Sequence, residues 1–261
     1  MTNDSDTAGP AWFTIHEAAD TTGWSARMLR YIESVGLITP SRSPAGYRLY
    51  GPAELQRLLA TACVEGEHFT AEAISRADGV DPELVRGWLS DELEGRRRLV
   101  QGEGVRRLSG VRLSRYRFRH ALYQRYVYGR LGPVERAWRH EAVATALEDL
   151  YRGSEDEIAV QLAHHFREAG IVDKAVHYLA HAGAHAVRLS ANHEAIQHYR
   201  QALDLLATLP KTSRHAETEL QLLVGLTTPL VSEKGYGATE VVKCCARAWE
   251  LCQQLGEPPQ I

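Results

Sequence analysis

Apolar positions recur at helical spacing in two short stretches near the N-terminus. Thr14 and Glu17 form a capping box, which predicts the start of a short helix. Gly23 then supplies a tight turn, and Ser25 is a good N-cap for a second helix over residues 26–35. This pattern predicts a helix-turn-helix. The polar face of its second helix carries Arg27, Arg30 and Tyr31.

The next stretch, residues 37–50, contains Pro40, Pro44 and Gly46. These residues rule out a third helix and favour a turn between two short extended pieces. Arg42 lies near the tip of this predicted wing and Arg48 in its return strand. A further helix is expected over residues 53–60.

Residues 62–118 combine helical and alternating patterns. Two helices are expected over residues 69–77 and 82–93, with Asp81 capping the second and Pro82 at its first position. Residues 97–118 alternate weakly and are interrupted by glycines, which predicts a hairpin. We therefore expect a second small winged-helix-like unit. Arg115, Arg117 and Arg119 should line one exposed edge of its hairpin.

From residue 119 to 261 the apolar period is helical throughout, so about seven or eight helices and no strands are expected. The predicted breaks are Gly132-Pro133, Gly153, Gly170, Pro210 and Gly235. Small residues and one aromatic residue also occur at the spacing of a tetratricopeptide (TPR) repeat, whose two helices approach closely. These residues are Gly183, Ala195, Tyr199 and Ala202.

The resulting fold class is mainly α. We expect a disordered N-terminus over residues 1–11, a winged helix-turn-helix over 12–61, the second winged-helix-like unit over 62–118, and a TPR-like α-helical solenoid over 119–261. Such solenoids bind peptides or partner domains on a concave face.

The net charge of −3 conceals an uneven distribution. Residues 86–139 hold 14 arginines and 5 acidic residues, whereas residues 140–261 hold 10 basic and 16 acidic residues. Residues 1–60 hold 5 basic and 6 acidic residues, so this segment attracts nucleic acid only weakly by charge. The arginines of the middle segment could form a second nucleic-acid surface, but a solvated strand edge is the stronger interpretation.

Other features bear on compartment and cofactors. No stretch is apolar enough to span a membrane, and the N-terminus lacks the pattern of a signal peptide, so we expect a cytoplasmic protein. The four cysteines form no CxxC pair and are expected to be reduced thiols. His177, His181 and His185 recur every four residues, but the outer two lie about 12 Å apart on a straight helix. We therefore expect no metal and no cofactor.

About residues 12–60 resemble the winged helix-turn-helix of the MerR family. The resemblance rests on Phe13-Thr14-Ile15, Thr22-Gly23-Trp24-Ser25, Leu29-Arg30-Tyr31, Gly36-Leu37-Ile38 and Gly46-Tyr47-Arg48-Leu49-Tyr50, in that order and spacing. It implies that the helix capped by Ser25 enters the major groove of double-stranded DNA, with Arg27 near base edges. It also implies that Arg30, Tyr31, Tyr47 and Arg48 contact phosphates. Ser25 and Arg42, which lies near the tip of the wing, are further DNA-binding candidates. Met28 and Ile32 depart from the usual threonine and tyrosine of the family.

Residues 62–261 resemble a different group, the helical region that follows the nucleotide-binding core of STAND-class signalling ATPases, including those fused to nucleotide cyclases. The residues that carry this resemblance are 63–69 and 115–124. Those relatives hold nucleotide with a GxxxxGK[ST] loop, which this sequence lacks. We therefore expect no ATPase activity and no catalytic residues.

Two functions remain open at this point. The first is a non-enzymatic, bacterial DNA-binding transcriptional regulator whose helical repeats sense a signal or bind a protein partner. The second is a non-catalytic fragment or scaffold subunit of a STAND-type signalling protein.

Overall fold

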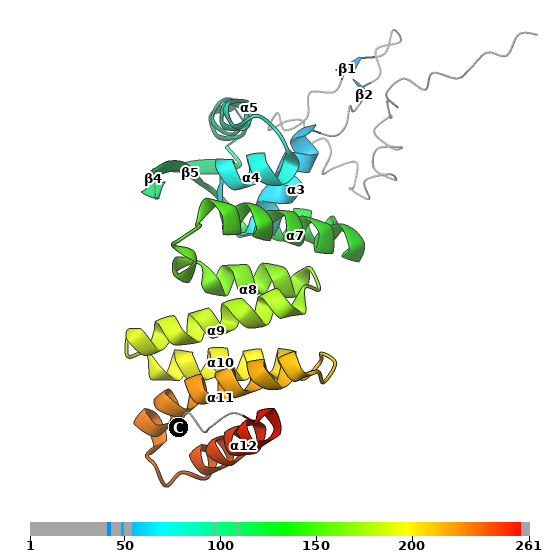
Figure 1. The fold of residues 1–261 in the computed structure, drawn as a ribbon. Helices are drawn as coiled ribbons and strands as arrows, with labels where there is room; N and C mark the ends of the chain where they lie inside the picture. The colour runs from blue at the N-terminus through cyan, green and yellow to red at the C-terminus, as the bar shows by residue number, and fades with distance from the viewer. Residues whose placement is uncertain (1–40, 43–47, 50–53, 97, 109, 257–261) are drawn as a thin grey trace, which may run out of the picture. The chain divides into compact units, whose positions relative to one another are not determined.

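The computed structural model describes residues 41–42, 48–49, 54–96, 98–108 and 110–256. Within them the chain is mainly helical, with one three-stranded sheet and one two-stranded hairpin (Figure 1). The chain divides into two compact units, Met1–Arg136 and Ala137–Ile261, called here the N-terminal and C-terminal units. This division lies beyond the expected boundary at residue 119, because helix α6 (Ala121–Arg130) packs on helix α3 (Glu54–Glu65).

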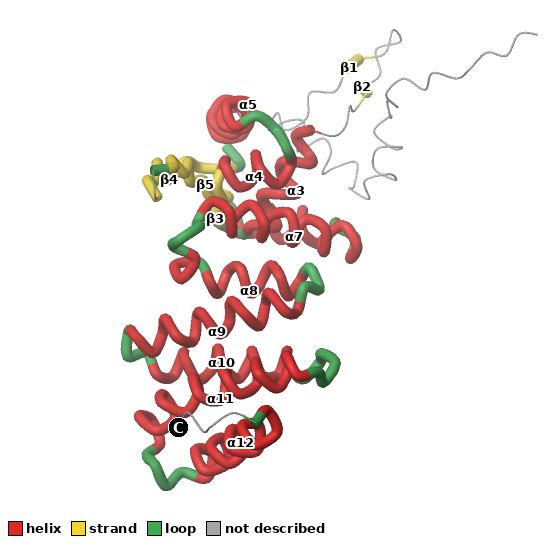
Figure 2. The backbone as a smooth tube through the Cα atoms, in the orientation of Figure 1, coloured by secondary structure: helices red, strands yellow, loops and turns green. Residues whose placement is uncertain are grey.

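The N-terminal unit alternates helices and strands, and its described part begins with two short strands, β1 (Ser41–Arg42) and β2 (Arg48–Leu49). Helix α3 follows, and it is longer than the helix expected over residues 53–60. The larger sheet and its helices come next (Figure 2). They are β3 (His68–Thr70), α4 (Ala71–Asp78), α5 (Pro82–Gly87), a π-helical segment (Trp88–Arg96), β4 (Val100–Leu108) and β5 (Val111–Phe118).

Helix α5 starts where its sequence predicts. The carboxylate of Asp81 accepts hydrogen bonds from the backbone N–H groups of Glu83, at 2.8 Å, and Leu84, at 3.2 Å. Pro82 takes the first helical position, where a missing N–H costs nothing. The predicted cap is confirmed.

Strand β3 corrects the prediction of a helix over residues 69–77, because Phe69 and Thr70 are extended. The Phe69 side chain is buried, and its ring lies 5.0 Å from that of Phe118 on β5. The backbone N–H and the hydroxyl of Thr70 both donate to Oε1 of Glu65, each at 3.0 Å. These tertiary contacts hold the segment extended, and helix α4 begins only at Ala71.

The larger sheet has the order β3-β5-β4, and all its pairs are antiparallel. Strand β5 is therefore central, so the prediction that Arg115, Arg117 and Arg119 line an exposed edge is wrong. Glu103 on β4 forms ion pairs with Arg115, at 3.5 Å, and Arg117, at 3.7 Å. The Nε of Arg119 donates to the backbone oxygen of Val100 at 3.2 Å.

Helix α4 is fixed to this sheet by a buried carboxylate. Glu72 accepts hydrogen bonds from the backbone N–H of Ser114, at 2.6 Å, and from its hydroxyl, at 3.0 Å. Arg86 on α5 adds a longer contact to Glu72, at 3.4 Å. One carboxylate therefore connects two helices and the central strand.

The described part of the C-terminal unit contains only helices, as its period predicted. Helix α7 (Pro133–Leu150) runs into this unit, and a 3-10 turn (Glu155–Glu157) follows. Helices α8 (Ala159–Glu168), α9 (Val172–Arg188), α10 (Asn192–Leu206), α11 (Ser213–Lys234) and α12 (Thr239–Leu255) come next, each packed on its neighbour in sequence. The predicted breaks at Gly132, Gly153, Gly170, Pro210 and Gly235 fall between helices, and Pro133 is the first residue of α7. None of the described helices is both long and apolar enough to cross a membrane.

The close approach predicted for α9 and α10 is present. A Cβ atom added to Gly183 would lie 2.8 Å from the ring of Tyr199. Gly225 on α11 meets the same ring from another direction, since a Cβ atom there would lie 2.6 Å from it. The ring of Tyr199 therefore packs between two glycines, and it connects α9, α10 and α11.

Candidate functional site

The β1–β2 hairpin is the described part of the predicted DNA-binding wing. Its strands are antiparallel, and its register pairs Arg42 with Arg48. Residues 43–47 connect the two strands in sequence and lie outside the described residues. The other residues singled out for DNA binding lie outside the described residues; they are Ser25, Arg27, Arg30, Tyr31 and Tyr47.

A second candidate site is a cavity of about 830 Å³ in the C-terminal unit. It lies between α9, the end of α10 and the start of α11, and we call it the α9–α11 groove. Its volume falls in the range of ligand pockets, about 300–1,000 Å³. The lining from α9 is one face of that helix, formed by Asp173, Val176, His177, Ala180, His181, Ala184 and Arg188.

One end of the groove is organised around Asp156, from the 3-10 turn. Its carboxylate contacts Nη2 of Arg188 at 2.5 Å and Nδ1 of His181 at 3.3 Å. Burial acts to raise the pKa of Asp156, but the hydrogen bond from His181 and the charge of Arg188 outweigh it and lower that pKa. This end therefore carries a stable carboxylate held against a guanidinium group.

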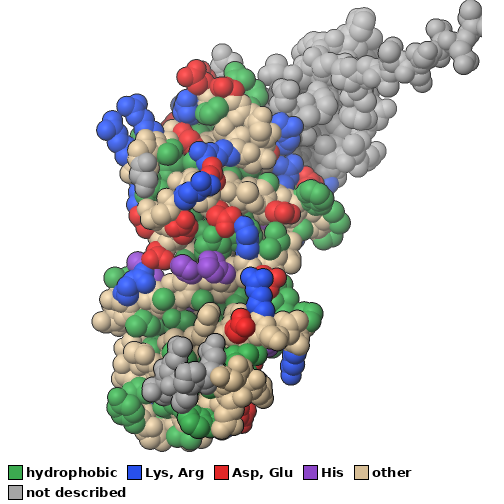
Figure 3. All heavy atoms as spheres, in the orientation of Figure 1, with side chains coloured by type: hydrophobic (Ala, Val, Ile, Leu, Met, Phe, Trp, Pro, Cys, Tyr) green, Lys and Arg blue, Asp and Glu red, His purple; other side chains and the backbone are tan. Residues whose placement is uncertain are grey.

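The middle of the groove is lined by histidine. The rings of His177 and His181 lie 4.5 Å apart. The pKa of His177 is lowered, chiefly by burial and then by the proximity of His181. Figure 3 shows histidine side chains grouped in the region of α8 and α9. Within the part of the chain that the structure describes, no group of three or more His, Cys, Asp or Glu residues could hold a metal ion.

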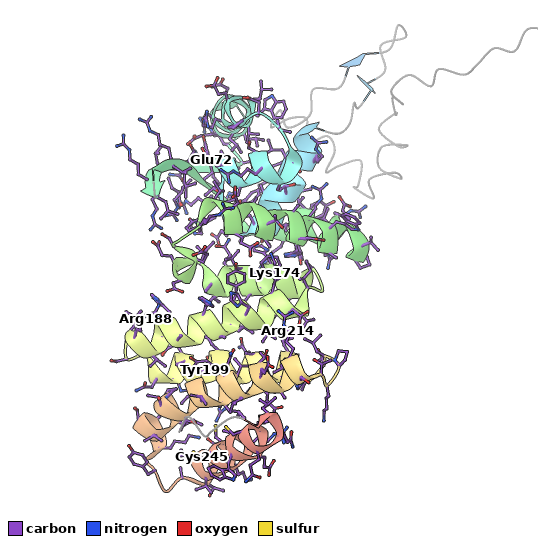
Figure 4. The ribbon with its side chains drawn as sticks, in the orientation of Figure 1. Glu72, Lys174, Arg188, Tyr199, Arg214 and Cys245 are labelled. Atoms are coloured by element: carbon purple, nitrogen blue, oxygen red, sulfur yellow. The ribbon has the colours of Figure 1, made fainter. Side chains whose placement is uncertain are left out.

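The far end of the groove is formed by α11 and the loop before it. Arg214 is exposed there, near the N-terminus of α11, whereas Arg188 ends α9. Figure 4 shows Arg188 and Arg214 toward opposite ends of these helices, with Tyr199 between them. Tyr199 also lines the groove, and burial raises the pKa of its hydroxyl.

This arrangement can bind an extended ligand. Besides its histidines, the groove offers apolar contact from Val176, Leu222 and the ring of Tyr199, and it offers arginine and carboxylate groups as well. The groove carries both charge signs, so it provides directional polar contacts and no strong attraction for one sign.

Sequence patterns revealed only part of this groove. The spacing of His177, His181 and His185 correctly placed them on one stripe of α9. Asp156 and Arg214 were not singled out, because each reaches the groove from a different element. No period within one helix can reveal residues that only the stacking of helices brings together.

Comparison with known proteins bears on the first site. Residues 14–50 match the family model described as MerR family regulatory protein. All seven residues singled out for DNA binding, from Ser25 to Arg48, lie inside this MerR segment. The match indicates a DNA-binding transcriptional regulator. No curated protein and no solved structure matches the chain.

The MerR match ends at Tyr50, just before helix α3, so it covers the β1–β2 hairpin and neither the larger sheet nor the C-terminal unit. The β1–β2 pairing agrees with the two extended pieces that the breakers in residues 37–50 predicted. The resemblance of residues 62–261 to STAND-class proteins stays a prediction.

Proposed function

We propose that this protein is a MerR-type, DNA-binding transcriptional regulator that reads double-stranded DNA with its MerR segment and binds a partner in the α9–α11 groove. The family match over residues 14–50 carries the proposal. The helix after Ser25 enters the major groove with Arg27 at base edges, and Arg48 contacts phosphate from the wing. Catalysis and bound cofactors have no part in this function.

Two further modules follow the MerR segment in this proposal. Helix α3, strand β3, helices α4 and α5, and the β4–β5 hairpin follow in the order expected of a second winged-helix-like unit. Helices α9 and α10 form one TPR-like pair, which the fit of Gly183 against Tyr199 supports. The groove beside this pair takes a segment of a protein partner, because it joins apolar contact with polar ends.

The test is fluorescence anisotropy of labelled duplexes, selected and scrambled in sequence, across a salt series. Arg27→Ala removes a base contact, so it should cost about 1–3 kcal/mol on the selected site and relax discrimination at one position. Arg48→Ala removes a phosphate contact, so it should weaken binding on both duplexes and lower the salt slope by about one.

Wild-type protein that binds neither duplex at low salt would contradict the DNA-binding proposal. Equal affinities of both variants and wild type would contradict the assignment of these two residues. If wild type binds neither duplex, a scaffold role without DNA binding takes the place of the proposed regulator.

A further inference from the structure

The β4–β5 hairpin carries a concentration of positive charge that its own fold does not explain. Residues 98–119 contain seven arginines and one acidic residue, Glu103. Five of these arginines fall into two groups in the structure. Arg115 and Arg117 both form ion pairs with the carboxylate of Glu103, which offsets part of their positive charge within the sheet.

The second group lies toward the turn and is exposed. It consists of Arg106, Arg107 and Arg112. Within the described part of the chain, no carboxylate lies at ion-pair distance from Arg107 or Arg112. Figure 3 shows Lys and Arg side chains standing clear of the surface in the region of this hairpin.

The register makes the arrangement of these charges unusual. Arg107 and Arg112 are directly paired across the two strands. Directly opposite residues of an antiparallel pair are close neighbours, and like charges there destabilise the sheet. An arginine pair at this position therefore opposes folding, and an anion bound between the two guanidinium groups would relieve the repulsion.

Buried neighbours fix the strand positions of the pair. Leu108 and Leu113 are buried next to Arg107 and Arg112 along the strands, and Gly110 has a positive φ of 88°. Arg107 and Arg112 themselves are exposed, so their guanidinium groups are accessible to a ligand.

The β1–β2 hairpin also pairs two arginines across its strands. In β1–β2 the register pairs Arg42 with Arg48, as it pairs Arg107 with Arg112 in β4–β5. The first pair lies inside the MerR segment, to which the proposed function assigns phosphate contacts. Guanidinium groups match phosphate oxygens in charge and geometry.

We propose that the β4–β5 hairpin is a second contact site for the phosphate backbone of double-stranded DNA, with Arg107 and Arg112 as the contacting residues. The choice of duplex DNA as the partner rests on the proposed function. The site compensates for the weak charge of residues 1–60, which hold 5 basic and 6 acidic residues. It adds affinity without sequence preference, because phosphates carry no base information.

The test compares wild type with the double variant Arg107→Gln and Arg112→Gln in the full-length protein. Binding to a labelled 30-base-pair duplex of scrambled sequence is measured by anisotropy from about 0.05 to 0.3 M salt. Loss of two phosphate contacts should lower the salt slope by about 2 and weaken binding about 10–60-fold near 0.1 M salt. Thermal stability should stay equal or rise, because the repulsion between the two arginines is gone.

Two controls make the result specific. The variant Arg107→Lys and Arg112→Lys keeps both charges and should keep the salt slope. The variant Arg152→Gln and Lys211→Gln removes two exposed charges from the C-terminal unit and should bind as wild type does. A loss of affinity in this second control equal to that of the hairpin variant would attribute the effect to net charge and overturn the proposal.

A third variant, Arg27→Ala with Arg48→Ala, distinguishes the contribution of the MerR segment to DNA binding from that of the hairpin. If this variant weakens binding while the hairpin variant matches wild type, the hairpin proposal fails and the proposed function stands. If only the hairpin variant weakens binding, the MerR assignment fails. Binding of vesicles containing phosphatidylserine that depends on Arg107 and Arg112, without any effect on DNA, would also overturn the proposal.

Discussion

At the scale of single residues, the packing of the C-terminal unit depends on two glycines, Gly183 and Gly225. Tyr199 fills the space that a Cβ atom would need at both Gly183 and Gly225. A glycine within a helix normally costs stability relative to alanine, by about 1 kcal/mol. Here that cost is offset by the packing of three helices around one ring.

The first prediction follows from this packing. Gly183→Ala should destabilise the protein by about 1–3 kcal/mol, because the new methyl group would overlap the Tyr199 ring. Gly225→Ala should have a similar effect. Gly129→Ala in helix α6 is the matched control, since a Cβ atom there meets nothing within 4 Å. Urea unfolding followed by circular dichroism measures the difference, and a Gly183→Ala protein as stable as wild type would contradict the account of Tyr199.

Glu65 is a second residue whose surroundings predict a measurable property. Its side chain is buried, and burial raises its pKa to about 8, although hydrogen bonds from Thr70 act in the opposite direction. The ordinary pKa of a glutamate side chain, as in an unfolded chain, is 4.5. Between pH 4.5 and pH 8, Glu65 is protonated in the folded protein and ionised in the unfolded chain.

The sign of the pH effect follows from proton binding. Since the folded state binds more protons, the contribution of Glu65 to stability is fully present below pH 4.5 and is lost as the pH rises toward 8. Glu65→Gln cannot release a proton, so the advantage of this variant over wild type should grow by at least about 1 kcal/mol between pH 5 and 8.5. Urea titrations at both pH values give the result. An advantage that is equal at both would show that Glu65 does not titrate in this range.

At the scale of elements, local sequence signals set where helices begin, and tertiary contacts set where strands form. Asp81 caps α5 by side-chain hydrogen bonds to two backbone N–H groups within three residues of it. Strand β3 has no comparable local signal. It exists because β5 provides a partner strand and Phe118 a surface for Phe69.

The element-scale prediction concerns the Asp81 cap. Asp81→Ala should cost about 1 kcal/mol, because two N–H groups at the start of α5 lose their acceptor. Asp81→Asn keeps an acceptor oxygen and should cost much less. Thermal unfolding monitored by tryptophan fluorescence compares the three proteins, and equal losses in both variants would show that charge and not capping is what Asp81 contributes.

At the scale of the whole molecule, the chain divides after Arg136, inside helix α7. The C-terminal unit has its own core, and it also holds a buried hydrogen bond between Nδ1 of His140 on α7 and Nδ1 of His165 on α8, at 2.8 Å. Helix α7 is therefore part of the packing of this unit.

A fragment of residues 133–261 should accordingly fold alone. We expect a helical circular dichroism spectrum with little strand signal and cooperative thermal unfolding, because every described element after α7 is helical. A fragment of residues 151–261 lacks His140 and should unfold at a lower temperature. A strand-rich spectrum, or equal melting of both fragments, would contradict this division of the molecule.

The sequence by itself determined the features that depend on neighbours along the chain. The helical period of residues 119–261, the break at Gly170, the cap at Asp81 and the hairpin closed at Gly110 could all be predicted. Each depends on residues within about one or two turns of one another, so a local pattern is sufficient. The MerR segment could likewise be recognised, because its residues form a continuous pattern.

Tertiary structure alone decided the features that join distant segments. Glu72 meets Ser114 across 42 positions, and Asp156 meets Arg188 across 32. The central place of β5, the division after Arg136 and the α9–α11 groove also depend on which elements pack together. Such packing reflects the burial of surfaces from the whole chain, which no local period encodes. The opposition of Arg107 and Arg112 spans only five positions, but it depends on the exact strand register, which the weak alternation of residues 97–118 did not determine.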